Sequence, residues 1–194
     1  MKGNKDNKIT KINNLMEEEK KQLIVLDGPN VAKKHGKDQE FSTDGIKIAI
    51  NYWNERGHDC LAFVPEHYVR RKPGQTVTLK EFMPKASNLT LMNELIDKGN
   101  VILTPPQDYD DIYVINYAMK HNGCIVTNDR FWDHIEKSQE KGMKAKREMQ
   151  KWIRDHTISF TFVRDEFLPV SFILFFIFIF ILFLIHFFFY YILF

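Results

Sequence analysis

Short apolar runs alternate along this chain with longer segments of helical periodicity, and this alternation constrains the fold more than any other feature. The helical segments are long enough to carry the chain back between parallel strands, which cannot be joined by tight turns. The order therefore predicts an α/β fold whose parallel sheet is covered by helices on both faces. We expect strands at 22–26, 59–64, 101–103, 124–127 and 158–163, and helices at 43–56, 87–99, 110–121, 131–139 and 144–156.

The length and charge of the chain restrict its class. Its 194 residues fit one domain that is large enough to bury its own core. The 27 Lys and Arg residues against 25 Asp and Glu residues give a net charge of +2, so a nucleic-acid surface must be a local patch. Cys60 and Cys124 show neither zinc-site spacing nor a disulfide framework, which favours a reduced, intracellular setting.

Composition divides the chain into three parts. Residues 1–21 are polar and are predicted to be a disordered arm, without the apolar core of a secretory signal peptide. Residues 22–169 contain the alternating elements and form the predicted domain. Residues 170–194 contain no Asp, Glu, Lys or Arg.

The apolar tail predicts a C-terminal hydrophobic helix in a membrane, because it is longer than the roughly 20 residues that span a bilayer. We therefore expect a cytoplasmic domain that is anchored by its tail to the endoplasmic reticulum or another organelle membrane. The alternative is that the tail is an artefact of the gene model and replaces the true C-terminus.

Acidic residues follow several of the predicted strands. Asp27 comes after the first strand, Asp110–Asp111 come soon after the third, and Asp129 comes after the fourth, with Asp133 one helical turn further on. Because the carboxyl ends of parallel strands lie at one edge of the sheet, where such folds have their active sites, we expect these side chains to meet.

A cluster of carboxylates repels itself unless a cation neutralises it. Oxygen ligands without clustered Cys or His favour a hard ion, Mg²⁺ or Mn²⁺, which activates water for attack on a phosphodiester. Asn30 and Asn128 add neutral polar groups at the same edge. The alternative for any single Asp is a turn former or a helix cap, but that explanation is weaker for the whole set.

Several motifs occur in an order that is specific to one family. They are Leu-Asp-Gly-Pro-Asn-Val-Ala at 26–32, Trp-Asn-Glu-Arg-Gly-His at 53–58, Phe-Val-Pro at 63–65, Tyr-Asp-Asp at 109–111, Val-Thr-Asn-Asp at 126–129 and Phe-Val-Arg-Asp-Glu-Phe-Leu-Pro at 162–169. Together they resemble the NYN domain of the Zc3h12a-like ribonucleases, also called the MCPIP or Regnase family. The resemblance covers about residues 22–169.

The resemblance implies a PIN-like α/β/α fold and a metal-dependent endoribonuclease that acts on single-stranded or stem-loop RNA, with mRNA decay as its role. The products would carry a 3′-hydroxyl and a 5′-phosphate. Relatives of this kind can self-associate, so a homo-oligomer is also expected.

The resemblance also implies an acidic site made by four catalytic residues, Asp27, Asp111, Asp129 and Asp133. The first three would hold Mg²⁺ or Mn²⁺, directly or through water. Asp133 would position or deprotonate the attacking water. Asp110 would tune the site, with Asn30 near the metal. His134 is expected to be an ordinary surface residue.

Two basic stretches are candidates for RNA contact. One follows the second predicted strand, where an aromatic residue precedes three cations, and the other follows the first motif. Cations would bind phosphates and the aromatic ring would stack on a base. The alternative is a solvated charged surface. The candidate RNA-binding residues are Tyr68, Arg70, Arg71 and Lys72 in the first stretch, and Lys33 and Lys34 in the second.

Two departures from the family leave a second function open. The loop at 104–108 is short and lacks the basic residues of animal relatives, and no CCCH zinc finger follows the domain. These departures favour a catalytically weak RNA-binding or interaction module that keeps the fold. A Rossmann-like nucleotide binder is disfavoured, because the chain has no glycine-rich phosphate loop.

Overall fold

A mixed six-stranded sheet forms the centre of the computed structural model, which describes residues 21–70, 86–105 and 111–170. The strand order is β3-β2-β1-β4-β5-β6, and the neighbours from β3 to β5 pair in parallel, as predicted. The strands are β1 (Leu23–Asp27), β2 (Asp59–Pro65), β3 (Val101–Thr104), β4 (Cys124–Val126), β5 (Thr157–Val163) and β6 (Glu166–Val170).

The helices confirm the predicted alternation. Two of the predicted helices have a side-chain cap at the N-terminus. Ser42 accepts a hydrogen bond from the Gly45 amide, and Asn88 accepts one from the Leu91 amide. The helices are α2 (Gly28–His35), α3 (Thr43–Asn54), α4 (Leu89–Asp97), α5 (Asp111–His121), α6 (Trp132–Ser138) and α7 (Met143–His156), with 3₁₀ turns at Glu66–Tyr68 and Gln139–Lys141.

Helix α2 is an element that the sequence did not predict. Asp, Gly, Pro and Asn at 27–30 are typical turn residues, so the local sequence favours a turn at this place. The same residues begin a helix here: Asp27 caps it by accepting from the Asn30 amide, and Pro29 lies in the first turn, where a missing N–H costs nothing. The helix therefore starts directly at the end of β1.

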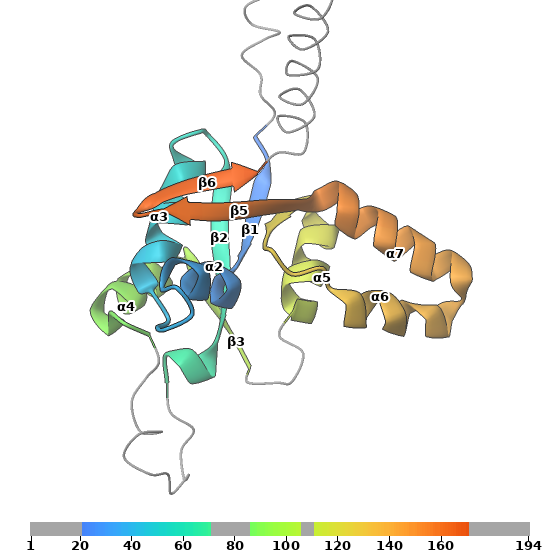
Figure 1. Cartoon of the computed structure of the whole chain (residues 1–194), viewed down its shortest axis with the longest axis horizontal. Helices are drawn as coiled ribbons and strands as arrows, with labels where there is room; N and C mark the ends of the chain where they lie inside the picture. Colours follow the sequence, from blue (N-terminus) through green and yellow to red (C-terminus); the bar gives the residue numbers. More distant parts are fainter. Residues whose placement is uncertain (1–20, 71–85, 106–110, 171–194) are drawn as a thin grey trace, which may run out of the picture.

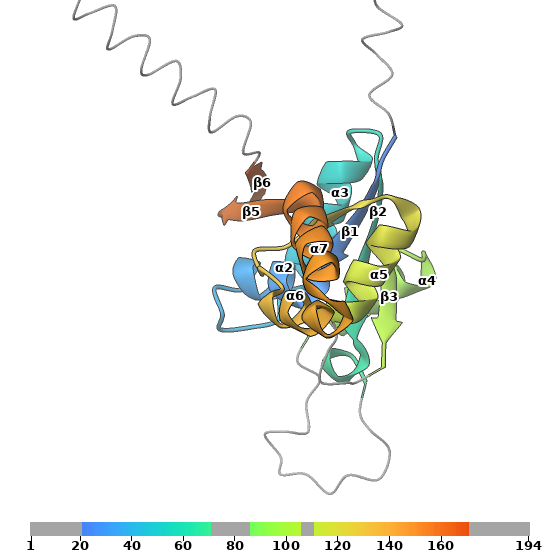
Figure 2. The same ribbon diagram turned by 90° about the vertical axis from the view of Figure 1, so that its right-hand side faces the viewer.

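Helices cover both faces of the sheet, so the domain has three layers (Figures 1 and 2). Ile24 and Leu26 of β1 pack with helices α2, α3 and α4 on one face. Val25 of the same strand packs with α5, α6 and α7 on the other face. Because neighbouring side chains of a strand point to opposite faces, β1 is apolar from Leu23 to Leu26, before it ends at Asp27, and it lies at the centre of the molecule.

The last strand departs from the parallel pattern. β6 pairs antiparallel with β5 through a tight turn in which Arg164 has a φ of 56°. Phe167 is buried and packs against Tyr52 of α3 and Phe160 of β5. β6 ends at Val170, the residue at which the sequence places the start of the apolar tail.

The predicted arm at 1–20 and the rest of the predicted tail at 171–194 lie outside the described residues. Within residues 21–70, 86–105 and 111–170, no helix is both long enough and apolar enough to cross a bilayer. The membrane span therefore stays a prediction from the sequence.

Candidate active site

Asp27 is the most buried of the predicted site residues. It ends β1 and is only 7% exposed. Its Oδ1 accepts a hydrogen bond from the Asn30 amide (3.2 Å), and its Oδ2 accepts one from the Thr127 hydroxyl (2.7 Å). β1 and β4 are neighbours in the sheet, which is why residues a hundred positions apart meet here. The carboxylate is held in one orientation at the carboxyl edge of the sheet.

The surroundings of Asp27 raise its pKa from 3.8 to about 6. Burial is the largest cause, because it disfavours the charged form. The hydrogen bonds from Thr127 and Asn30 lower the pKa, whereas the nearby carboxylates of Asp111 and Asp129 raise it. Asp111 and Asp129 are therefore close enough to Asp27 to disfavour its charged form.

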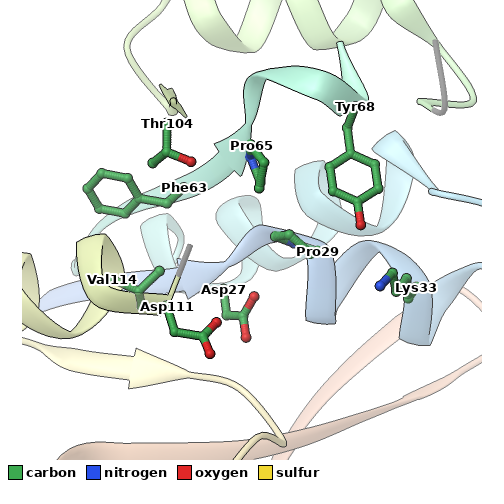
Figure 3. A pocket seen from close by; sticks show the side chains of 9 residues that line it. All are labelled: Asp27, Pro29, Lys33, Phe63, Pro65, Tyr68, Thr104, Asp111 and Val114. Carbon is green, nitrogen blue, oxygen red and sulfur yellow. The ribbon is translucent and has the colours of Figure 1, made fainter. Parts of the chain in front are cut away.

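Asp111 is brought to the same place by α5. It is the first residue of that helix, and with Asp27 it lines one pocket, where the two carboxylates lie side by side (Figure 3). His134 also approaches Asp111, with Nε2 3.9 Å from Asp111 Oδ2. The His134 side chain is only 10% exposed, so the expectation of an ordinary surface histidine was wrong. α6 packs against the sheet and turns this ring toward the acidic edge.

Asp129 and Asp133 lie on the loop and helix that follow β4. Thr127 Oγ1 accepts a hydrogen bond from the Asp129 amide (3.0 Å), and Asp129 Oδ1 accepts one from the Phe131 amide (2.9 Å). This tight turn places the buried Phe131 at a φ of 51°. Asp133 is exposed in the first turn of α6. Asp110, the other predicted acid, lies outside the described residues.

The two predicted asparagines support the loop after β4. Asn30 Oδ1 accepts from the Asn128 amide (3.0 Å). The Asn128 side chain bonds both backbone groups of Phe160 in β5, donating to the carbonyl (3.0 Å) and accepting from the amide (3.1 Å). These bonds tie α2, the β4 loop and β5 together beside Asp27, so both residues position the site through its backbone.

A pocket of about 160 Å³ opens beside the two carboxylates. Its lining comes from six elements, which the parallel topology brings to one edge: β1, α2, β2, the 3₁₀ turn at Glu66–Tyr68, β3 and α5. Figure 3 shows the acids at one end and Thr104 at the other. The lining residues are Asp27, Pro29, Lys33, Phe63, Pro65, Tyr68, Thr104, Asp111 and Val114.

The donor set fits a cation held by two carboxylates. In the described part of the chain, no three His, Cys, Asp or Glu side chains are arranged to hold a metal ion together. Mg²⁺ is often bound by only one or two carboxylates, with water at its other positions. Asp27 and Asp111 supply two. Burial is the main cause of the raised pKa of Asp27, and the neighbouring carboxylates of Asp111 and Asp129 add to it, so a cation bound here would stabilise the charged form.

The predicted RNA-binding residues are distributed unevenly around this site. Lys33 lines the pocket, with Nζ 6.0 Å from the centre of the Tyr68 ring. Tyr68 also lines the pocket, and its ring stacks on Phe41 at 4.2 Å. Lys34 is exposed on α2, and Arg70 pairs with Glu66 at 3.5 Å. Arg71 and Lys72 lie outside the described residues.

Three site residues were missed from the sequence. Thr127 holds Asp27, Thr104 lines the pocket, and His134 approaches Asp111. Thr104 and Thr127 each stand at the carboxyl end of a strand, and that position was the available signal. The approach of His134 to Asp111 had no signal in the neighbouring sequence, because it depends on how α6 packs.

Comparisons with known proteins agree with this architecture. The family described as "Zc3h12a-like Ribonuclease NYN domain" matches residues 20–174. Endoribonuclease rege-1 of Caenorhabditis elegans is 29% identical over 155 residues, which cover 75% of this chain but 22% of that protein. The chain thus spans about a fifth of the length of this relative.

Two solved structures of nuclear protein-only RNase P 2 (PRORP2) from Arabidopsis thaliana share the fold. Their TM-scores are 0.57 and 0.54, each at 23% sequence identity. Each similarity covers 84% of this chain, and 32% and 33% of the respective plant chains.

Proposed function

Because the chain belongs to the Zc3h12a-like ribonuclease NYN domain family, we propose that it is a metal-dependent endoribonuclease. The observation that carries the proposal is the pairing of Asp27 with Asp111 in one pocket, with Asp129 close enough to raise the Asp27 pKa. A structural role alone gives no reason to keep these like charges together.

Asp27 and Asp111 would hold Mg²⁺ or Mn²⁺, with Asp129 acting directly or through water. When bound, the cation supplies charge neutralisation at the scissile phosphate and an activated water. Thr127 orients Asp27, and His134 lies where it steadies Asp111. Lys33 at the rim attracts the RNA backbone, and Asp133 accepts a proton from the attacking water. The products would carry a 3′-hydroxyl and a 5′-phosphate.

The test is cleavage of a stem-loop RNA by the full chain, with and without EDTA. We expect cleavage with Mg²⁺ or Mn²⁺, none in EDTA, and a loss of at least about a hundredfold in Asp129→Asn. Asp97→Asn is the matched control, because Asp97 ends α4 just before β3 and so lies at the opposite edge of the sheet. Cleavage that persists unchanged in EDTA and in Asp129→Asn would refute the proposal.

A second candidate is an RNA-binding module with little turnover. The feature that favours it is the short loop at 104–108, which contains no basic residue. Tight RNA binding by the wild type without turnover, at high protein concentration and with Mn²⁺ present, would select this function.

We further propose that mRNA is the substrate, that the decay of mRNA is the outcome, and that the enzyme is tethered to a cytosol-facing membrane. The support for the tether is the charge-free stretch at 170–194. The support for mRNA is the family membership.

A further inference from the structure

The end of the pocket away from the acids contains an unusual polar group. Thr104 ends β3 and is 4% exposed, yet its hydroxyl has no hydrogen-bond partner among the described residues. Figure 3 shows the hydroxyl directed into the pocket above Phe63, toward Pro65. A buried hydroxyl without a partner costs free energy, so its retention at a site wall calls for a partner from outside the protein.

The chemistry of this end excludes a phosphate. Phe63 and Pro65 supply apolar surface, and Thr104 supplies one neutral hydroxyl. The cation that lines the pocket, Lys33, lies away from Thr104, beyond Pro29 in Figure 3. A phosphate needs cations or several donors, whereas a planar heterocycle needs apolar contact on its faces and one hydrogen bond at its edge.

The size of the pocket points to a single ring system. About 160 Å³ is well below the roughly 300–1,000 Å³ of sites that enclose a drug-sized ligand. The rest of a larger ligand must lie outside, as it would for one nucleotide of a polymer whose backbone passes the carboxylates.

We propose that this pocket takes one unpaired nucleobase of the RNA, beside the scissile phosphate, with the Thr104 hydroxyl bonded to the edge of the base. Thr104 is then a specificity residue, and the enzyme prefers certain bases at one position next to the cut. The inference rests on the proposed ribonuclease function. It requires an unpaired nucleotide, because a base in a duplex cannot enter.

The test compares Thr104→Val, which is nearly isosteric and lacks the hydroxyl, with Thr104→Ser, which keeps it. The full chain is incubated with a random-sequence RNA library, and the base frequency at each position around the cut is read by sequencing. We expect the wild type and Thr104→Ser to share a preference at one position. Thr104→Val should lose it, with KM raised about tenfold, the effect of one hydrogen bond, and kcat less affected.

Thermal unfolding separates this role from a structural one. Removal of a hydroxyl that has no partner in the free protein should leave Tm unchanged or raise it. Thr157→Val is the matched control, because Thr157 Oγ1 is also buried without a partner among the described residues, and Thr157 pairs with Ile125 of β4, outside the lining of this pocket. This variant should keep the base preference and KM.

Three results would overturn the inference: a wild type without base preference, an unchanged preference in Thr104→Val, or an equal loss in Thr157→Val. Failure of the proposed function is a separate result. If the wild type cleaves nothing, the same library is selected for binding in EDTA. A preference that is lost in Thr104→Val but kept in Thr104→Ser then supports the pocket, and its absence refutes it.

Discussion

Asp27 shows how one side chain combines burial with function. Its carboxylate is almost fully covered and lies near two other acids, so its charged form is less stable than that of an exposed aspartate. Thr127 opposes this by donating a hydrogen bond that stabilises the charge. We infer that Asp27 serves binding rather than stability. A bound cation would offset the free-energy cost of burying its charged carboxylate.

We predict that Asp27→Asn changes how stability depends on pH. The folded-state pKa of about 6 exceeds the ordinary 3.8, so the folded protein binds a proton more readily than the unfolded chain. The contribution of the Asp27 carboxyl group to the free energy of unfolding is fully present below about pH 4 and is lost as pH rises through about 6. This loss is on the order of 3 kcal/mol. Asparagine does not ionise, so the variant should lack this loss and be the more stable protein at neutral pH.

Urea unfolding of both proteins in EDTA, at acidic and neutral pH, measures this difference. Asp97→Asn, an exposed acid at the end of α4, should follow the wild type. Added Mg²⁺ should stabilise the wild type and leave Asp27→Asn unaffected. If the free energy of unfolding depended on pH identically in the wild type and Asp27→Asn, the raised pKa of Asp27 would be refuted.

At the scale of elements, α2 lies unusually close to β2. Gly28 follows Asp27, and a Cβ at this position would press against the Phe63 carbonyl oxygen and lie 2.6 Å from Val64 Cγ2. The absence of a side chain lets the helix begin immediately after the strand. That close approach places Pro29 and Lys33 in the pocket beside Phe63.

We predict that Gly28→Ala destabilises the fold by about 1–3 kcal/mol, because the added methyl group must push α2 away from β2. The displacement should also lower cleavage, since the Asn30 amide would move away from Asp27. The control is Gly99→Ala, where the added Cβ meets nothing within 4 Å but the backbone has a φ of 72°. We expect that variant to lose about 1 kcal/mol of stability, from backbone strain alone. It should keep its full activity at saturating RNA. Chemical unfolding gives both values, and a Gly28→Ala protein of wild-type stability and activity would contradict the prediction.

At the scale of the whole molecule, the strand order assembles the site. β1 lies between β2 and β4, so Asp27 has Phe63 on one side and the β4 loop with Thr127 on the other. β3 brings Thr104 to the same edge, and α5 brings Asp111 from beyond it. Each wall of the pocket thus belongs to a different part of the chain.

The location of the whole protein is also open to test. We predict that the full chain stays with membranes after alkaline carbonate extraction, because 170–194 is apolar and charge-free over more than the roughly 20 residues of a bilayer span. A chain in which several residues of this stretch are replaced by lysine should be released. Release of the unaltered chain would contradict a membrane span. Recovery as a homo-oligomer in detergent would support the self-association that the family resemblance implies.

The sequence predicted much of the fold because its main signals are local. Apolar runs and helical periodicity are visible in a few consecutive residues, and they located five strands and the main helices correctly. Two elements were not predicted. Residues 28–35 begin within a cluster that is typical of turns, and 166–170 form a strand only because β5 offers an edge for antiparallel pairing.

The acidic edge was predicted for a similar reason. The position of each Asp after a strand is a local fact, and parallel topology then places Asp27, Asp111 and Asp129 together. Burial and hydrogen bonding of individual side chains are not local. The covered Asp27, the unpartnered Thr104 hydroxyl and the approach of His134 to Asp111 each depend on which element packs beside which.

By itself, then, the order of residues determined the α/β class, the parallel strands and the set of carboxylates at one edge. Only the tertiary structure decided how deeply each carboxylate is buried, which pair shares a pocket, and what lines that pocket opposite them. The physical reason is range: propensity and periodicity act over a few residues, whereas desolvation and charge repulsion act between side chains that the fold brings together from distant parts of the chain.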